Sequence, residues 1–119
     1  MEQLSEEIAD DLCTPANSRA IRDALDVLSG GWKLPILVSL SHGPKRFKEI
    51  ARDVEGISDK MLSKELKSLE LNLLVVKNTI DEFSSIAEYA ATEHAYTLHE
   101  VMVSLSAWGK LHRKKITGK

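Results

Sequence analysis

Three lysines share one face of a predicted helix in the middle of the chain. When residues 58–70 are placed at 100° per residue, Lys60, Lys64 and Lys67 lie about 140–200° from Leu62. A narrow apolar stripe lies within about 40° of Leu62 and is formed by Leu62, Leu66, Leu69 and Leu73. The pattern predicts a helix that leucines anchor and that presents cations outward, which suits a groove lined by phosphates.

Other polar and basic residues near this helix are candidates for DNA contact. Ser58 is placed to cap the helix, whose first amides then favour one phosphate. Ser63 is short enough to reach a base edge or a phosphate, whereas Met61 lies either at the edge of the core or against a thymine methyl group.

Three cations outside this helix have two readings each, a DNA-backbone contact or an ordinary solvated charge. For Arg46 we favour the backbone contact, because it stands just before Phe47 at the start of a predicted helix. For Lys45 and Lys77 both readings stay open.

Catalytic chemistry has no visible apparatus in this sequence. Of the four histidines, His94 and His99 are five residues apart, which does not align them as a chelating pair on a helix. No nucleophile elbow, phosphate-binding glycine loop or Cys-x-x-Cys motif occurs. We therefore expect no enzymatic activity, no metal and no cofactor.

The chain is weakly acidic, but its charge is unevenly distributed. The net charge is −2 and the pI is near 6.1. Residues 43–77 hold eight basic and six acidic side chains, a balance of +2 that leaves −4 for the rest. A nucleic-acid binder with this balance depends on the placement of its cations and not on its net charge.

Length and composition indicate one globular domain in the cytoplasm. The 119 residues are 43% hydrophobic and 29% charged. We expect no membrane association, because no apolar run approaches the ~20 residues that span a bilayer and no signal segment is seen. A single cysteine fits a reducing compartment. Residues 1–12 carry five acidic groups and no basic one, so we predict a flexible acidic arm before a domain at residues 13–116.

The predicted elements follow the order of four helices, two strands and a helix. The helices are expected at about 14–28, from 33 or 34 to 40, at about 47–54, at 58–70 and from 93 onward. The strands are expected at 73–80 and 86–92, with a polar tip between them. This order predicts a mainly α fold with a small β-hairpin (α+β), a winged helix-turn-helix.

The last predicted helix carries more apolar surface than one small domain can cover. We therefore predict a two-fold dimer formed by this helix and the first one. Two reading helices would then face half-sites about 34 Å apart. The predicted interface residues are Ile21, Leu25, Leu98, Val101, Met102, Leu105 and Trp108.

Four motifs resemble the HxlR-type winged-helix transcription regulators, which are MarR-like. They are GGWKLPIL, GPKRFKEI, GISDKMLSKELKSLE and AWGKLHRKKI, and the resemblance covers residues 13–116. It implies a cytoplasmic bacterial regulator that binds double-stranded DNA as a homodimer. In that family the helix matching residues 58–70 enters the major groove, the hairpin flanks it, and the first and last helices form most of the dimer interface.

The hairpin departs from the family pattern. Relatives usually carry a proline near the position of Ser84 and basic or β-branched residues beyond it, whereas this chain has no proline and no basic residue between Asn78 and Ala91. More of the DNA affinity must then fall on Arg46, Lys60, Lys64 and Lys67.

The resemblance also makes Cys13 a candidate redox sensor, because some relatives use a cysteine near this position to sense thiol reagents. The neighbouring carboxylates of Asp10 and Asp11 disfavour a reactive thiolate. We therefore favour a half-buried structural thiol over a sensor.

Two functions of different classes follow. The first is a sequence-specific DNA-binding transcription regulator with an unassigned effector ligand. The alternative is a winged-helix module for protein–protein interaction without specific DNA binding, which the acidic balance and the wing without arginine favour.

Overall fold

The computed structural model describes residues 12–81, 83 and 86–119. The predicted acidic arm therefore lies outside the described residues except for Leu12. The predicted hairpin tip is described only at Asp81 and Phe83, and Ser84 lies outside the described residues. The chain divides into two units, one that ends at Gly31 and one that begins at Trp32.

In the first unit, the predicted helix is present as α2 (Pro15–Leu28). The Thr14 hydroxyl accepts a hydrogen bond from the Asn17 N–H at 3.1 Å, and Pro15 occupies the first turn, where its missing N–H costs no helical bond. No side chain of α2 is buried within the described chain, and Leu25 is 64% exposed. The helix therefore presents an uncovered apolar stripe.

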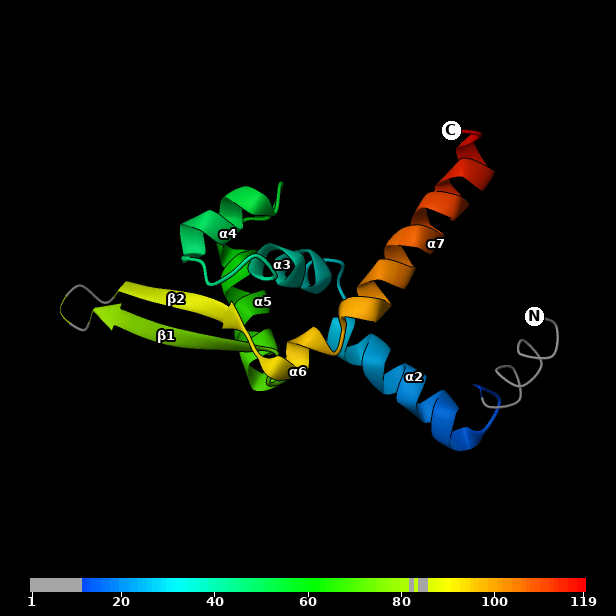
Figure 1. Cartoon of the computed structure of the whole chain (residues 1–119), viewed down its shortest axis with the longest axis horizontal. Helices are drawn as coiled ribbons and strands as arrows, with labels where there is room; N and C mark the ends of the chain where they lie inside the picture. Colours follow the sequence, from blue (N-terminus) through cyan, green and yellow to red (C-terminus); the bar gives the residue numbers. More distant parts are fainter. Residues whose placement is uncertain (1–11, 82, 84–85) are drawn as a thin grey trace. The chain divides into compact units, whose positions relative to one another are not determined.

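The second unit holds the winged helix-turn-helix (Figure 1). Its elements are α3 (Lys33–Leu40), α4 (Phe47–Asp53), α5 (Asp59–Leu71), β1 (Val75–Asp81), β2 (Ile86–Ala91), α6 (Glu93–Tyr96) and α7 (His99–Thr117). The predicted mainly α fold with one hairpin is confirmed.

The core of the second unit lies where α3, α4 and α5 meet. Fully buried side chains come from each of the three helices, among them Ile36, Leu40, Ile50, Leu62, Leu66 and Leu69. Each such side chain contributes about 1.5–3 kcal/mol of burial free energy. Helix α3 is largely buried, and Pro35 is accommodated in its first turn.

The end of α5 differs from the prediction at one leucine. Leu73 was expected to complete the apolar stripe, but α5 ends at Leu71, and Leu73 has a φ of 62° and is 72% exposed. The left-handed residue reverses the chain, so that the Leu74 N–H donates to the Leu69 carbonyl at 2.9 Å. Leu74, 2% exposed, takes the buried place instead.

The hairpin pairs β1 and β2 antiparallel, with Val75 opposite Ala91 and Asp81 opposite Ile86 across an irregularity. The observed strands lie within about two residues of the predicted ones. Lys45 adds a further backbone bridge to β2, because Lys45 and Tyr89 exchange N–H to carbonyl hydrogen bonds of 2.9 and 2.8 Å. The segment before α4 is thereby attached to the wing.

The single last helix that we predicted is two helices, α6 and α7. The Thr92 hydroxyl accepts a hydrogen bond from the Ala95 N–H at 3.2 Å, and the buried Ala95 holds this short helix in the second unit. A new helix then starts at His99. Apolar periodicity continues across the break, which is why the pattern did not reveal it.

Candidate nucleic-acid interface

Helix α5 begins at a side-chain cap. The Ser58 hydroxyl accepts a hydrogen bond from the Met61 N–H at 3.1 Å, as the sequence predicted. Asp59 adds a favourable negative charge to the first turn. The remaining N–H groups of this 13-residue helix leave its first turn suited to an anion.

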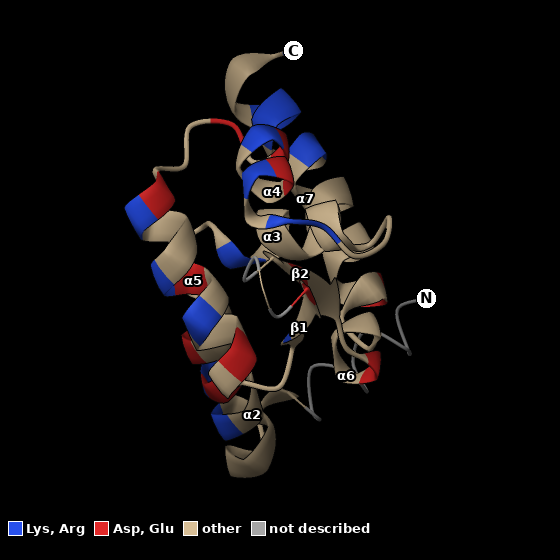
Figure 2. Cartoon of the chain, turned by 90° about the vertical axis from the view of Figure 1, so that its left-hand side faces the viewer, with Lys and Arg blue, Asp and Glu red and all other residues tan. Residues whose placement is uncertain are grey.

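Helix α5 has one buried face and one exposed face. Leu62, Leu66 and Leu69 are at most 1% exposed. Lys60, Lys64 and Lys67 on the opposite side are exposed, and so is Ser63 on one flank. Met61 is half-buried between the two faces. In Figure 2, acidic residues lie between the basic residues along the ribbon of α5.

Glu65 does not pair with the lysines of this cationic face. It is buried, and its Oε2 lies 3.0 Å from Nζ of Lys33 at the start of α3. Within the described part of the chain, no carboxylate oxygen lies within 4.0 Å of the ammonium groups of Lys60, Lys64 or Lys67. These three charges are available to a ligand.

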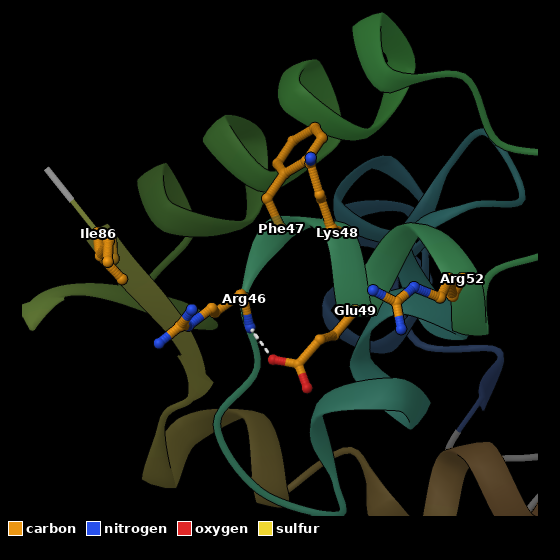
Figure 3. Close-up of a pocket in the computed structure, with 7 residues that line it drawn as sticks. Arg46, Phe47, Lys48, Glu49, Arg52 and Ile86 are labelled. Carbon is orange, nitrogen blue, oxygen red and sulfur yellow. Dashed lines mark hydrogen bonds between the residues drawn. The ribbon is translucent and has the colours of Figure 1, made fainter. Parts of the chain in front are cut away.

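A hollow of about 660 Å³ lies between α4 and the start of β2 (Figure 3). The Arg46 side chain extends toward Ile86, while Arg52 lies at the other end of α4. One oxygen of Glu49 accepts a hydrogen bond from the Arg46 backbone N–H at 2.9 Å. With Lys48, the lining thus holds three cations and one carboxylate, a surface that favours an anion.

Lys45 is engaged inside the protein. Its ammonium group forms an ion pair with Asp53, and the Ser39 hydroxyl donates a hydrogen bond to the same carboxylate oxygen at 2.7 Å. The bonds from Lys45 and Ser39 hold the pKa of Asp53 below its usual value. This network joins α3, the loop before α4 and α4 itself, so Lys45 orients the helix-turn-helix scaffold.

The wing carries little positive charge. Nζ of Lys77 lies 5.8 Å from the centroid of the Tyr89 ring, within the range of a cation–π contact. Lys77 remains exposed, and it is followed in the hairpin by the carboxylates of Asp81 and Glu88.

The predicted interface residues are exposed or half-buried in the described chain. Ile21 and Leu25 lie on α2 in the first unit. In the second unit, Leu98 and Met102 are half-buried, whereas Val101, Leu105 and Trp108 are 44, 48 and 61% exposed. The Trp108 ring stacks on His112 at a centroid distance of 4.8 Å.

Cys13 is exposed. The prediction of a half-buried structural thiol at this position is therefore wrong. The exposure of Cys13 could not be predicted from the sequence, because the residue lies before α2 and outside any periodic pattern.

Lys48, Arg52 and the buried Lys33–Glu65 pair had no role predicted from the sequence. The first two were visible in principle, because residues four apart share a helix face. The buried pair joins residues 32 positions apart and left no such signal.

Among the described residues, no helix has the length and apolarity to cross a membrane, and no three His, Cys, Asp or Glu side chains are grouped as metal ligands.

Residues 27–117 match a family model described as HxlR-like helix-turn-helix. The chain is similar to an HTH-type transcriptional regulator of Bacillus subtilis (strain 168), YtcD, with 31% identity over 99 residues, 83% of this chain and 79% of YtcD. The regulator YodB of the same organism is 36% identical over 88 residues, 74% of this chain and 79% of YodB.

Solved structures of such regulators have the same fold. The structure of YtcD aligns with a TM-score of 0.73 and 32% identity, covering 79% of this chain and 96% of that one. The redox regulator HypR in its reduced form aligns with a TM-score of 0.76 and 28% identity, covering 84% of this chain and 99% of that one.

Proposed function

The chain belongs to the HxlR-like helix-turn-helix family of transcription regulators, and from this premise we propose that it binds specific DNA sequences as a homodimer. The family resemblance read from the motifs is confirmed. So is the expectation that the protein is not an enzyme, because its relatives are transcriptional regulators. We propose that its ligand is double-stranded DNA and, because DNA is the ligand, that the protein acts in the cytoplasm.

The observation that carries this proposal is the lysine face of α5. Lys60, Lys64 and Lys67 are exposed opposite a buried leucine stripe, and no described carboxylate neutralises them. With α5 in the major groove, these cations contact phosphates, while Ser63 and Met61 face the base edges.

Further phosphate contacts come from the ends of the helices. The capped first turn of α5 at Ser58 suits one phosphate. Arg46, together with Lys48 and Arg52 in the hollow beside α4, suits the DNA backbone that flanks the groove. Lys77 is a lesser contact at the base of the wing, and Lys45 acts chiefly through Asp53.

The homodimer uses the uncovered faces of α2 and α7. The proposed interface residues remain Ile21, Leu25, Leu98, Val101, Met102, Leu105 and Trp108, most of which are exposed in the single chain. Sedimentation equilibrium at micromolar concentration tests this proposal. We expect a mass of two 13.2 kDa chains, and a monomer mass would contradict the dimer.

Selection from a pool of random DNA duplexes tests specific binding. We expect enrichment of a two-fold symmetric sequence with half-sites about one helical turn apart. Gel-shift titrations then compare the enriched duplex with a scrambled duplex of equal length and composition. Equal affinity for both duplexes, together with co-purification of a protein partner, would instead support a winged-helix module for protein–protein interaction.

Thiol-dependent regulation is a second candidate property, favoured by the exposure of Cys13. HypR is described as a redox regulator, and YodB has been solved in diamide-treated and quinone-bound forms. Titration of the enriched duplex with and without diamide tests it, with Cys13→Ser as the control. Equal affinity of the wild type under both conditions would remove the sensing role.

A further inference from the structure

Two buried charges meet behind the exposed face of α5. Lys33 is the first residue of α3, and Glu65 lies in the middle of α5 beside Leu66. Nζ of Lys33 and Oε2 of Glu65 are 3.0 Å apart, and the two side chains are only 9% and 8% exposed. The pair connects the central scaffold helix directly to the helix that we propose reads DNA.

Such a pair is poorly explained as a source of stability. Removing two charges from water carries a penalty that their attraction often fails to exceed, and an apolar pair of similar volume is commonly as stable. Leu62, Leu66 and Leu69 already anchor the same side of α5 in the core. A role other than stability is therefore needed for Lys33 and Glu65.

The ion pair depends on the rotation of α5 about its axis more strongly than the leucine contacts do. Burial of apolar area depends weakly on small rotations of a helix about its axis, because the hydrophobic effect is non-directional. A side-chain tip lies about 5–6 Å from the helix axis, so a rotation of roughly 20° moves it by about 2 Å. Such a movement breaks the 3.0 Å contact between Lys33 and Glu65, because both side chains are buried in the packed core and cannot follow it as exposed side chains can.

The same rotation shifts the exposed side of α5 by a similar amount. A hydrogen bond from Ser63 to a base edge fails when its partners separate by 2 Å, because such bonds need about 2.7–3.2 Å. Lys60, Lys64 and Lys67 have long flexible side chains that follow a phosphate over that distance. Rotation of α5 therefore affects recognition of sequence more than attraction to the backbone.

We propose that Lys33 and Glu65 are positioning residues that fix the rotation of α5, and so determine which DNA sequences the protein distinguishes. This inference rests on the proposed DNA-binding function. The pair then acts on specificity, which is the ratio of the affinities for a selected and a scrambled duplex. This ratio depends on the Lys33–Glu65 pair, whereas the affinity for the scrambled duplex does not.

The test is the double variant Lys33→Met/Glu65→Met, which replaces both charges with unbranched apolar side chains of similar length. Affinities for the duplex enriched by the wild type and for its scrambled counterpart are measured by fluorescence anisotropy at one salt concentration. We expect the scrambled duplex to bind within about twofold of the wild type. The specificity ratio should fall by at least about tenfold, and the melting temperature should change little.

The charge-swapped variant Lys33→Glu/Glu65→Lys is the matched control, because it restores an ion pair at the same place. We expect it to recover most of the specificity ratio. An unchanged ratio in a folded double Met variant would overturn the inference. Failure of that variant to fold would also overturn it, because the pair would then be a stabilising element. A wild type that enriches no duplex would instead overturn the proposed function.

Discussion

Replacing Lys64 with alanine tests the DNA-facing side of α5 most directly. Its ammonium group is exposed, and no described carboxylate lies within 4.0 Å of it. Alanine is the best helix former, so the change leaves α5 intact and alters unfolding free energy by less than about 0.5 kcal/mol. Any large effect on DNA binding then comes from the lost contact.

The size of the effect follows from counterion release. Each phosphate contact adds about 0.9 to the slope of log affinity against log salt, so a two-fold dimer loses about 1.8 with Lys64→Ala, and a monomer about 0.9. Between 50 and 200 mM salt, the wild-type dimer should therefore lose roughly 12-fold more affinity than the variant, since fourfold raised to 1.8 is about 12. The slope thus reports both the contact and the number of chains bound.

Fluorescence-anisotropy titrations at four or five salt concentrations measure these slopes. Lys114→Ala in the last turn of α7 makes the same change of charge on another helix and should leave the slope unchanged. If Lys64→Ala keeps the wild-type slope, Lys64 does not contact phosphate and the proposed docking of α5 is wrong.

Three further predictions concern the scaffold that positions α5. Leu66→Ala should lower the unfolding free energy by about 2–5 kcal/mol in chemical denaturation, because Leu66 is 1% exposed. Leu71→Ala on the same helix, 79% exposed, should change it by less than about 0.5 kcal/mol, and equal effects would contradict the assigned faces. Leu73→Gly should raise it by roughly 0.5–1 kcal/mol, because it relieves a left-handed φ of 62°; no gain over Leu73→Ala would show that the strain is absent. Because Lys45 and Ser39 lower the pKa of Asp53 from 3.8, the stability that this group adds is present above that pH and is lost as pH falls through the lowered pKa. Urea unfolding of wild type and Asp53→Asn at pH 6 and pH 3 should therefore show a larger acid loss in the wild type, and parallel losses would refute it.

The sequence determined the features that repeat along the chain. The leucine and lysine faces of α5 and the cap at Ser58 were predicted, because a helix turns linear spacing into faces and its ends need local partners. The order of the helices and the hairpin was also readable from local patterns along the chain, and that order predicted the winged helix-turn-helix.

Only the tertiary structure decided how individual charges are used. Lys45 was a candidate for DNA contact, but it pairs with Asp53. Glu65, for which the sequence predicted no partner, is buried against Lys33. Leu74 is buried in the core and Leu73 is not, because Leu73 adopts a left-handed backbone conformation. Partners distant in sequence leave no periodic trace, so they are known only once the chain has folded and brought α3 against α5.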